Sequence, residues 1–180
     1  MEEKPKYSKI VVSGRICTGK STLVQNLVKA LGWDTFSSGQ YLRSYARDHH
    51  LAIEDAQEQS KKMTNKIDNM IRDVLKGNSH IVIDAWMGGI MSHGIKDVLK
   101  ILLICDDVER FTRFAQRENI SFLQARKRVL HREKKVLEKI QEIHGRHDIF
   151  DPKHYNMVID TSGKKPDEIV SKVLQKLKHT

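Results

Sequence analysis

Short apolar runs recur along the chain and are separated by stretches with helical spacing. The runs cover residues 9–13, 33–37, 80–84, 99–104 and 156–160. All but 33–37 are rich in β-branched residues or leucine, and most end at a turn residue or an acid, which is typical of β-strands. The run at 33–37, Trp-Asp-Thr-Phe-Ser, is a further short candidate strand. The runs at 80–84 and 99–104 are apolar at nearly every position, so we expect these two strands to be buried on both faces.

Helical periodicity fills the intervals between the runs. Residues 23–31, 63–75 and 169–177 each carry apolar side chains at helical spacing, and Gly32 follows the first stripe as a helix stop. Strands that alternate with helices predict an α/β fold in three layers, with a five-stranded parallel sheet flanked by helices. Ligands of such a sheet bind at the carboxyl ends of its strands.

The length of 180 residues fits one domain with a sizeable core, and neither a repeat nor a Pro/Gly-rich linker divides the chain. No apolar run approaches the roughly 20 residues that cross a bilayer, and the segment Met1–Lys6 lacks the apolar stretch of a signal peptide. We therefore expect a cytoplasmic protein without a membrane partner. Cys17 and Cys105 lack the close spacing of metal or redox pairs.

The formal net charge of +9 predicts a surface that attracts polyanions. Basic residues cluster at positions 126–135, read as RKRVLHREKK, and an opposing apolar face is formed by Val129, Leu130, Val136, Leu137 and Ile140. Two interpretations stay open, a solvated helix face and a surface for a phosphate backbone. Few aromatic residues are evident for stacking bases, which counts against a nucleic-acid partner.

One motif points to a definite chemistry, because it follows the first strand and opens the first helix. It consists of Gly14, Arg15, Ile16, Cys17, Thr18, Gly19, Lys20 and Ser21. Glycines at both ends let the backbone curl with its N–H groups inward, and the helix that follows adds its positive end. We predict that Lys20 reaches the β- and γ-phosphates of ATP, that Ser21 binds Mg²⁺ and that Thr22 adds a phosphate contact.

Polar residues follow two further strands at the predicted ligand edge. Asp84 ends the run at 80–84, where a carboxylate can hold Mg²⁺ directly or through water, and Gly88 and Gly89 come soon after it. Arg110, Arg113 and Arg117 recur at helical spacing after the fourth strand. Fixed arginines stabilise the charge on a transferring phosphoryl group, whereas the competing interpretation is a solvated surface. His49, His50, His144 and His147 show no diagnostic metal spacing and are expected at the surface.

From about Lys9 to Leu174 the chain resembles the cytidylate kinase-like nucleoside monophosphate kinases, a group of P-loop NTPases. Ser37, Gly39 and Arg43 match the Ser-x-Gly-x-x-x-Arg segment with which that family grips its monophosphate. Further matches fall in the family's nucleotide-contacting helix, its closing lid and its last strand, namely Arg110, Arg113, Arg117, Glu118, Ile120, Ser121, Arg132, Glu133, Glu142, Ile143, Gly145 and residues 155–162.

This resemblance implies a single kinase domain over residues 1–180. Its core would comprise 1–36, 76–112 and 149–180, its monophosphate-binding segment 37–75 and its lid 113–148. The implied catalytic residues are Lys20, Arg113, Arg117 and Arg132, and Arg113 would also flank the ATP base. The implied residues of the acceptor site are Ser37, Gly39, Arg43, Asp68, Trp86 and Gly89. Closure of both segments would exclude water and suppress ATP hydrolysis.

Two positions depart from the family pattern. Trp86 stands where an Arg usually follows the third strand, and Lys139 stands where a lid Arg is common. The resemblance implies transfer of the ATP γ-phosphoryl to CMP or dCMP, and from the expected fold we predict a monomer. Two alternatives remain open, namely a P-loop kinase for another nucleotide or small metabolite, which Trp86 favours, and an ATP-dependent protein that binds RNA or a partner through residues 126–135.

Overall fold

A central parallel sheet organises the computed structural model, which describes residues 6–51 and 61–178. Its strands lie in the order β2-β3-β1-β4-β5, and every neighbouring pair is parallel. Their bounds are β1 Lys9–Gly14, β2 Asp34–Ser37, β3 Ile81–Asp84, β4 Val98–Ile104 and β5 Met157–Asp160. The predicted five-stranded α/β fold is therefore confirmed, and the apolar runs supply all five strands.

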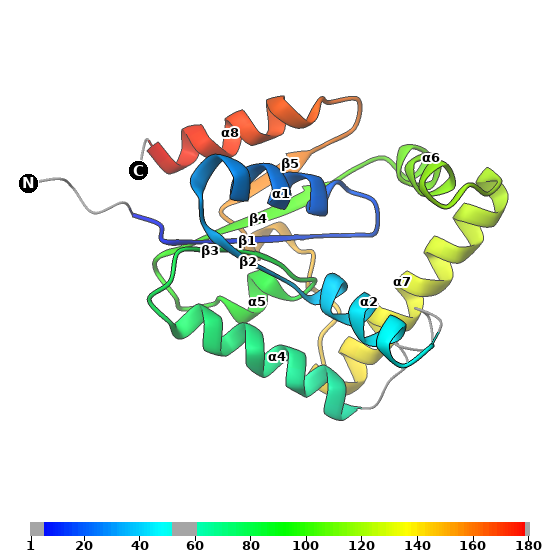
Figure 1. Ribbon diagram of the computed structural model, residues 1–180, viewed down its shortest axis with the longest axis horizontal. Helices are drawn as coiled ribbons and strands as arrows, with labels where there is room; N and C mark the ends of the chain where they lie inside the picture. The colour runs from blue at the N-terminus through cyan, green and yellow to red at the C-terminus, as the bar shows by residue number, and fades with distance from the viewer. Residues whose placement is uncertain (1–5, 52–60, 179–180) are drawn as a thin grey trace, which may run out of the picture.

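Helices cover both faces of this sheet. α1 and α8 lie on one face, and α4 and α5 lie on the other, while α6 and α7 stand beyond one end of the sheet (Figure 1). The helices, with one short 3-10 turn (η1), are α1 Lys20–Leu31, α2 Ser38–Asp48, α4 Lys61–Lys76, α5 Gly88–Met91, α6 Asp107–Glu118, α7 Phe122–His144, η1 Pro152–His154 and α8 Pro166–Lys178.

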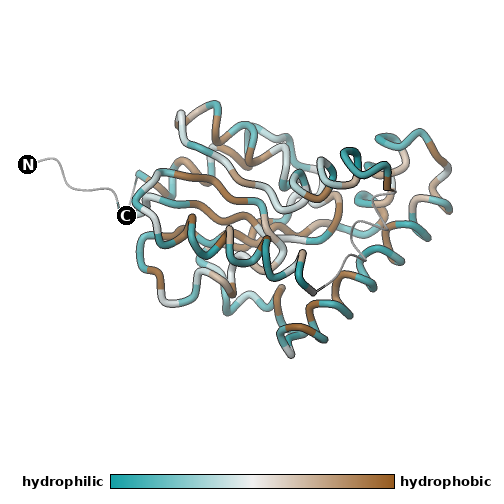
Figure 2. Tube along the Cα trace, turned by 60° about the horizontal axis from the view of Figure 1, so that its bottom comes forward, coloured by the Kyte–Doolittle hydropathy of each residue, from teal (hydrophilic) through white to brown (hydrophobic). Residues whose placement is uncertain are grey.

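The strands owe their burial to apolar side chains on both sides of the sheet. In β1, Ile10 and Val12 pack toward α1 and α8, whereas Val11 packs with the residues of α4 on the opposite face. Hydrophobic segments accordingly run through the middle of the molecule (Figure 2). Because successive side chains of a strand point to opposite faces, a run without polar positions fits this two-sided core.

The parallel arrangement gathers the carboxyl ends of the strands at one edge. β1 lies at the centre of the sheet, between β3 and β4, and Val12 is in register with Asp84. Ser37 at the end of β2 is in register with the same Asp84. The loops that follow β1, β2 and β3 therefore meet at this edge, where ligands of such sheets bind.

α6 and α7 form a helical arm with well-defined ends. Asn119 ends α6 in a left-handed conformation, and Ser121 starts α7 with a capping box that includes Gln124. Residue 113, the predicted start of the lid, lies inside α6, so we regard both helices as the arm. Leu130 was expected on the apolar face of the basic stretch, but its side chain is 41% exposed. Of the apolar residues predicted for that face, only Val129 and Ile140 are fully packed in the core.

The predicted monophosphate-binding segment includes residues 52–60, which lie outside the described residues.

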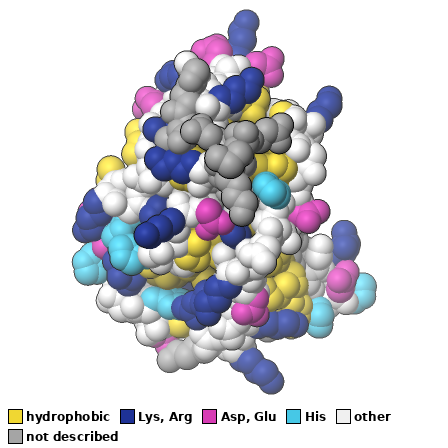
Figure 3. All heavy atoms as spheres, turned by 90° about the vertical axis from the view of Figure 1, so that its left-hand side faces the viewer, with side chains coloured by type: hydrophobic (Ala, Val, Ile, Leu, Met, Phe, Trp, Pro, Cys, Tyr) yellow, Lys and Arg dark blue, Asp and Glu magenta, His cyan; other side chains and the backbone are white. Residues whose placement is uncertain are grey.

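None of the helices within 6–51 and 61–178 combines the length and the apolar character that a membrane span requires. Cys17 and Cys105 are both free thiols. On the side of the molecule shown in Figure 3, basic side chains are interspersed with acidic and histidine side chains, so the net charge forms no single patch there.

Candidate active site

The loop between β1 and α1 has the backbone shape that phosphate binding requires. Gly14 and Gly19 have φ angles of +153° and +95°, and a Cβ atom at Gly14 would lie 2.5 Å from the carbonyl oxygen of Leu103. Only glycine fits at position 14, because that contact involves backbone that cannot move aside. Cys17 also adopts a positive φ of 60°, so the loop turns back toward the start of α1.

Lys20 reaches back across this loop. Its Nζ donates hydrogen bonds to the carbonyl oxygens of Gly14 at 2.8 Å and Arg15 at 2.7 Å. Burial lowers the pKa of Lys20, while the Asp84 carboxylate acts in the opposite direction. A phosphate chain in the loop would add negative charge beside the ammonium group and so favour its charged form. The predicted position of Lys20 at the phosphates fits this geometry.

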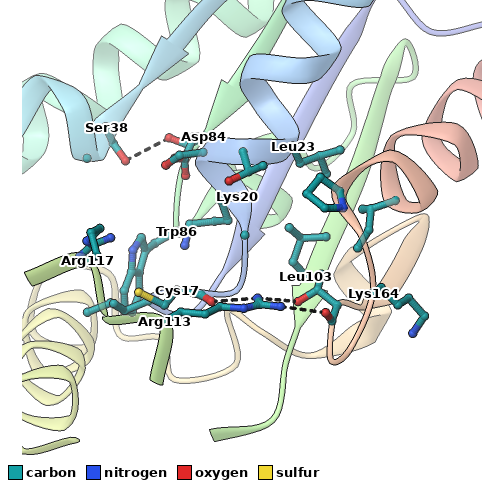
Figure 4. Close-up of a pocket in the computed structure, with 18 of the residues that line it drawn as sticks. Cys17, Lys20, Leu23, Ser38, Asp84, Trp86, Leu103, Arg113, Arg117 and Lys164 are labelled. Atoms are coloured by element: carbon teal, nitrogen blue, oxygen red, sulfur yellow. Dashed lines mark hydrogen bonds between the residues drawn. The ribbon is translucent and has the colours of Figure 1, made fainter. Parts of the chain in front are cut away.

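A cleft with a volume of about 500 Å³ opens above the loop (Figure 4). The phosphate loop contributes Ile16, Cys17, Gly19, Lys20, Ser21 and Thr22 to its lining. Thr18 is buried, and its hydroxyl donates to the carbonyl oxygen of Arg15 at 3.0 Å. Arg15 instead packs over the ring of Phe150, 5.7 Å from its centroid, outside the cleft lining. The loop therefore presents its carboxyl half to the cleft.

Three arginines from the helical arm face the same cleft, namely Arg113, Arg117 and Arg132. Arg113 donates to the carbonyl oxygen of Cys17 at 3.3 Å and to that of Thr161 at 3.0 Å (Figure 4). Arg117 is 55% exposed and donates to Glu118 at 2.9 Å. A cluster of guanidinium groups beside a phosphate loop can stabilise charge on transferring phosphoryl oxygens.

Arg110, expected in the same row, does not line this cleft. It is only 1% exposed and pairs with Glu133 at 2.6 Å. The reason is that Arg110 lies on the packed side of α6, where Phe111 and Phe114 are also buried. Its predicted place in a row of arginines at the ligand edge is therefore wrong.

Oxygen donors suited to Mg²⁺ lie on the other side of Lys20. Asp84 is only 6% exposed and lines the cleft together with Ser21. Its Oδ2 accepts a hydrogen bond from Ser37 at 3.3 Å, and Ser38 donates to its carbonyl oxygen at 3.2 Å (Figure 4). Within the described ranges no group of three or more His, Cys, Asp or Glu side chains could hold a metal ion. One carboxylate and one hydroxyl fit Mg²⁺, which usually keeps waters and phosphate oxygens as its other ligands.

The thiol of Cys17 is a poor nucleophile in this setting. Burial raises its pKa, although the charges of Arg117 and Lys20 act in the opposite direction. Since the thiolate is the reactive form of cysteine, the neutral thiol disfavours covalent chemistry at this residue. The site is instead a cradle of positive charge and backbone N–H groups, which suits direct transfer between bound anions.

The chain is similar in sequence to proteins named cytidylate kinases. A cytidylate kinase of Thermoplasma acidophilum is 31% identical over 166 residues, which cover 89% of this chain and 87% of that protein. The chain belongs to the cytidylate kinase-like family of P-loop kinases. It is an ATP-dependent phosphotransferase. Residues 10–131 also match the family described as AAA domain.

Two further comparisons concern proteins with other names, one similar in sequence and one similar in structure. An S-adenosylmethionine-dependent nucleotide dehydratase of Lacinutrix mariniflava is 29% identical over 172 residues, which cover 93% of this chain but only 35% of that protein. The solved structure of a shikimate kinase from Acinetobacter baumannii in complex with shikimate has a TM-score of 0.62 and 16% identity, and it covers 98% of this chain and 94% of that chain. The latter likeness concerns the fold alone.

The acceptor-site residues that the family resemblance implied do not all lie in one place. Gly39, Arg43 and Trp86 line the cleft. Ser37 lies at its border, where its hydroxyl caps α2 by accepting from the N–H of Gln40. Gly39 lies close to Arg43, because a Cβ atom at position 39 would be 3.3 Å from Nη1 of that arginine. Arg43 on α2 therefore adds a guanidinium group to the same cleft that the phosphate loop lines.

Asp68 and Gly89 lie elsewhere in this kinase. Asp68 lines a second cavity of about 130 Å³ behind Trp86 and pairs with His144 at 2.9 Å. His144 is therefore largely buried, and its expected place at the surface is wrong, because the last turn of α7 packs near α4. Gly89 lies against the ring of Tyr155, since a Cβ atom there would be 2.6 Å from that ring, and it lines neither of these cavities.

One group of residues was missed by sequence reasoning. The far end of the cleft is formed by β4, the loop after β5 and the start of α8, through Leu103, Thr161, Lys164, Pro166 and Ile169. Thr161 donates to the carbonyl oxygen of Thr18 at 3.0 Å. Residues 161–163, Thr-Ser-Gly, directly follow the last strand. A polar turn at the carboxyl end of a strand is where ligands of such sheets bind, so this turn could have predicted this end of the cleft.

Proposed function

We propose that this protein is a nucleoside monophosphate kinase that transfers the γ-phosphoryl group of ATP to CMP or dCMP. The observation that carries this proposal is one cleft that joins the phosphate loop to a separate arginine, Arg43, with Arg117 and Arg132 among its lining residues. Such a cleft accommodates two anions side by side. A phosphate-group acceptor needs a second anion site of this kind, whereas hydrolysis of ATP alone does not.

The proposed transfer is direct. A phosphate oxygen of the acceptor attacks the γ-phosphorus, and the bond from that phosphorus to the β–γ bridging oxygen breaks, so that ADP leaves and a nucleoside diphosphate forms. Lys20 stabilises charge on the β- and γ-phosphate oxygens, while Arg117 and Arg132 stabilise charge on the group in transfer. Ser21 and Asp84 would hold Mg²⁺, which neutralises phosphate charge when bound.

The acceptor end of the proposed site is assembled by α2 and Trp86. Arg43 would hold the monophosphate, and the nucleoside would extend from Gly39 and Trp86 toward the second cavity, which these two residues also line. That cavity is largely apolar, with Ile67, Ile71 and Met91 in its wall, so it suits the faces of a base better than a further phosphate. The preference for CMP and dCMP rests on the cytidylate kinases among the relatives.

A second candidate is a P-loop kinase with a different acceptor. Trp86 favours it, since this residue replaces the Arg that is usual in the family. Its ring lies 5.4 Å from that of Phe150, and Nζ of Lys20 lies 6.0 Å above it. An indole ring stacks on flat apolar groups but cannot donate the two hydrogen bonds of a guanidinium group. Another nucleotide base or a small phosphorylated metabolite is therefore the alternative acceptor.

Acceptor-stimulated release of ADP from ATP and Mg²⁺ decides between these candidates. The test uses CMP, dCMP, UMP, AMP and GMP, with Lys20→Ala as the control. We expect turnover with CMP or dCMP and a loss of at least about 10³-fold in the control. Turnover confined to another acceptor would support the second candidate, and turnover retained in the folded Lys20→Ala variant would refute the mechanism.

Substitution of Trp86 then tests the acceptor end. Trp33 lies against His80, with ring centroids 5.1 Å apart, and does not line the cleft, so Trp33→Phe leaves Trp86 as the single tryptophan of this chain. Addition of the preferred monophosphate to that variant is expected to change the emission of Trp86. An unchanged emission at saturating acceptor would place the nucleoside away from this ring.

A further inference from the structure

A buried ion pair holds the outer side of the phosphate loop. The carboxylate of Glu133 accepts hydrogen bonds from the N–H of Ile16 at 3.0 Å and from Nη1 of Arg15 at 3.1 Å. Arg110 donates to the carbonyl oxygen of Ile16 at 2.9 Å and to Glu133 at 2.6 Å. The N–H and the carbonyl group of Ile16 are thus both held from the helical arm, although Ile16 belongs to the loop.

These contacts form in a site with little access to water. Arg110 is 1% exposed and Glu133 is 2% exposed. Inside a protein such a pair is costly to desolvate, and replacement by apolar side chains is often neutral or stabilising. The pair contacts the loop directly next to Cys17, whose φ of 60° is an unfavourable backbone conformation outside glycine. A role in shaping the loop accounts for its position better than general stability does.

Glu133 is also the immediate neighbour of Arg132 on α7. Both residues lie inside one unbroken helix, Phe122–His144. Arg132 lines the cleft, whereas Glu133 is hydrogen-bonded to the phosphate loop, which lines the same cleft. A helix moves as a rigid element over one turn, so a bond between Glu133 and Ile16 fixes the distance from Arg132 to the loop.

We infer that Glu133 is a positioning residue that sets Arg132 against the phosphate loop for phosphoryl transfer. The helical arm is joined to the loop by its buried carboxylate, and the arginine on the same turn is thereby held at the transferring group. A displacement of about 1 Å at a reacting centre can cost about 10²-fold in rate. In its effect on kcat, loss of the Glu133 contact acts through Arg132 and changes little once Arg132 is absent.

A double-mutant cycle on turnover tests this dependence. Glu133→Gln is expected to lower kcat by about 10- to 100-fold in the parent chain and by less than about 3-fold in an Arg132→Ala background. The KM for the acceptor stays within about 2-fold in both. An equal fold-loss of kcat in the two backgrounds would show independent roles and overturn the inference, as would full activity in folded Glu133→Gln.

Matched variants separate positioning from folding. Glu138→Gln lies on the same helix, where Glu138 is 58% exposed and pairs with Lys134 at 3.7 Å, and it is expected to keep parental kcat. If Glu133→Gln does not give a cooperative thermal transition, Glu133→Asp takes its place, because it keeps the charge beside Arg110 and withdraws the carboxylate by one methylene. The same background dependence is expected, and its absence in that variant refutes the inference.

The inference rests on the proposed function, since its main readout is phosphoryl transfer. Calorimetric binding of ATP gives a readout that does not depend on an acceptor. Glu133→Gln is expected to weaken ATP binding by at least about 5-fold relative to Glu138→Gln, because the Arg15–Ile16 segment is no longer held. Unchanged ATP affinity in the folded variant would overturn the link to the loop, whereas failure of every acceptor in the parent chain would overturn only the proposed function.

Discussion

The imidazole Nε2 of His144 lies 2.9 Å from Oδ2 of Asp68, and the two side chains are only 15% and 10% exposed. The contact joins the last turn of α7 to the middle of α4, which are far apart in the sequence. It therefore links the helical arm to α4, which lines the second cavity at the acceptor end of the proposed site. A buried carboxylate without this imidazole would be costly to ionise.

Replacement of His144 by Ala is expected to destabilise the fold more at pH 7 than at pH 4. Burial raises the pKa of Asp68, and His144 opposes this effect. A carboxyl group with a raised pKa in the folded state favours folding below its unfolded pKa, and this contribution is lost as the pH rises through the folded pKa. Without His144 this loss of stability is larger. We expect the free energy of unfolding of His144→Ala to be about 2 kcal/mol lower than that of the parent protein at pH 7.

Urea unfolding at the two pH values measures this difference. His147→Ala is the matched control, because His147 is exposed and contacts Gln141 at 3.1 Å. Equal destabilisation of His144→Ala at pH 4 and pH 7 would refute the electrostatic explanation and leave only lost packing. Asp68→Asn together with His144→Ala is expected to remove the pH dependence, since no carboxylate then remains at the site.

Arg43→Ala is expected to raise the KM for the acceptor by at least about 10-fold and to leave the KM for ATP within about 2-fold. The reason is that Arg43 lines the cleft from α2, beside Gly39 and apart from the phosphate loop in the sequence. Initial rates at varied concentrations of each substrate measure both constants. Arg47→Ala serves as the control on the same helix, because Arg47 is 77% exposed and pairs with Asp48. A rise confined to the KM for ATP would move Arg43 to the donor site.

Gly14→Ala is expected to abolish ATP binding and to lower the free energy of unfolding by several kcal/mol. The added Cβ atom would lie 2.5 Å from the carbonyl oxygen of Leu103 in the neighbouring strand β4, so β1 and β4 have to separate at the loop. Gly32→Ala is the comparison, because Gly32 also has a positive φ but nothing lies within 4 Å of its added Cβ atom. That variant should cost about 1 kcal/mol and keep ATP affinity.

Calorimetric ATP titration and thermal unfolding of both glycine variants check this prediction. Equal costs for the two positions would mean that backbone conformation alone explains the effect and that the contact with β4 relaxes. Retained ATP affinity in Gly14→Ala would contradict the proposed shape of the loop.

The sequence by itself was sufficient for the fold and for the phosphate-binding half of the site. Apolar runs predicted β1, β3 and β4, because strands buried on both faces need apolar side chains at successive positions. The shorter and less apolar runs at 33–37 and 156–160 correspond to the edge strands β2 and β5. The loop from Gly14 to Ser21 was found because its chemistry is local, with glycines, one lysine and one hydroxyl held at fixed spacing by a strand and a helix. Ser37, Gly39 and Arg43 came from the family resemblance.

Tertiary structure decided what depends on contacts between distant segments. Arg110 and Arg113 have the same residue type and helical spacing, yet one pairs with Glu133 in the core and the other lines the cleft. Asp68 meets His144, and Thr161 meets the phosphate loop, only because the chain brings those segments together. A helix or strand can be predicted from the periodicity of its own residues. The partner of a buried polar group, by contrast, is set by packing between segments that are distant in the sequence.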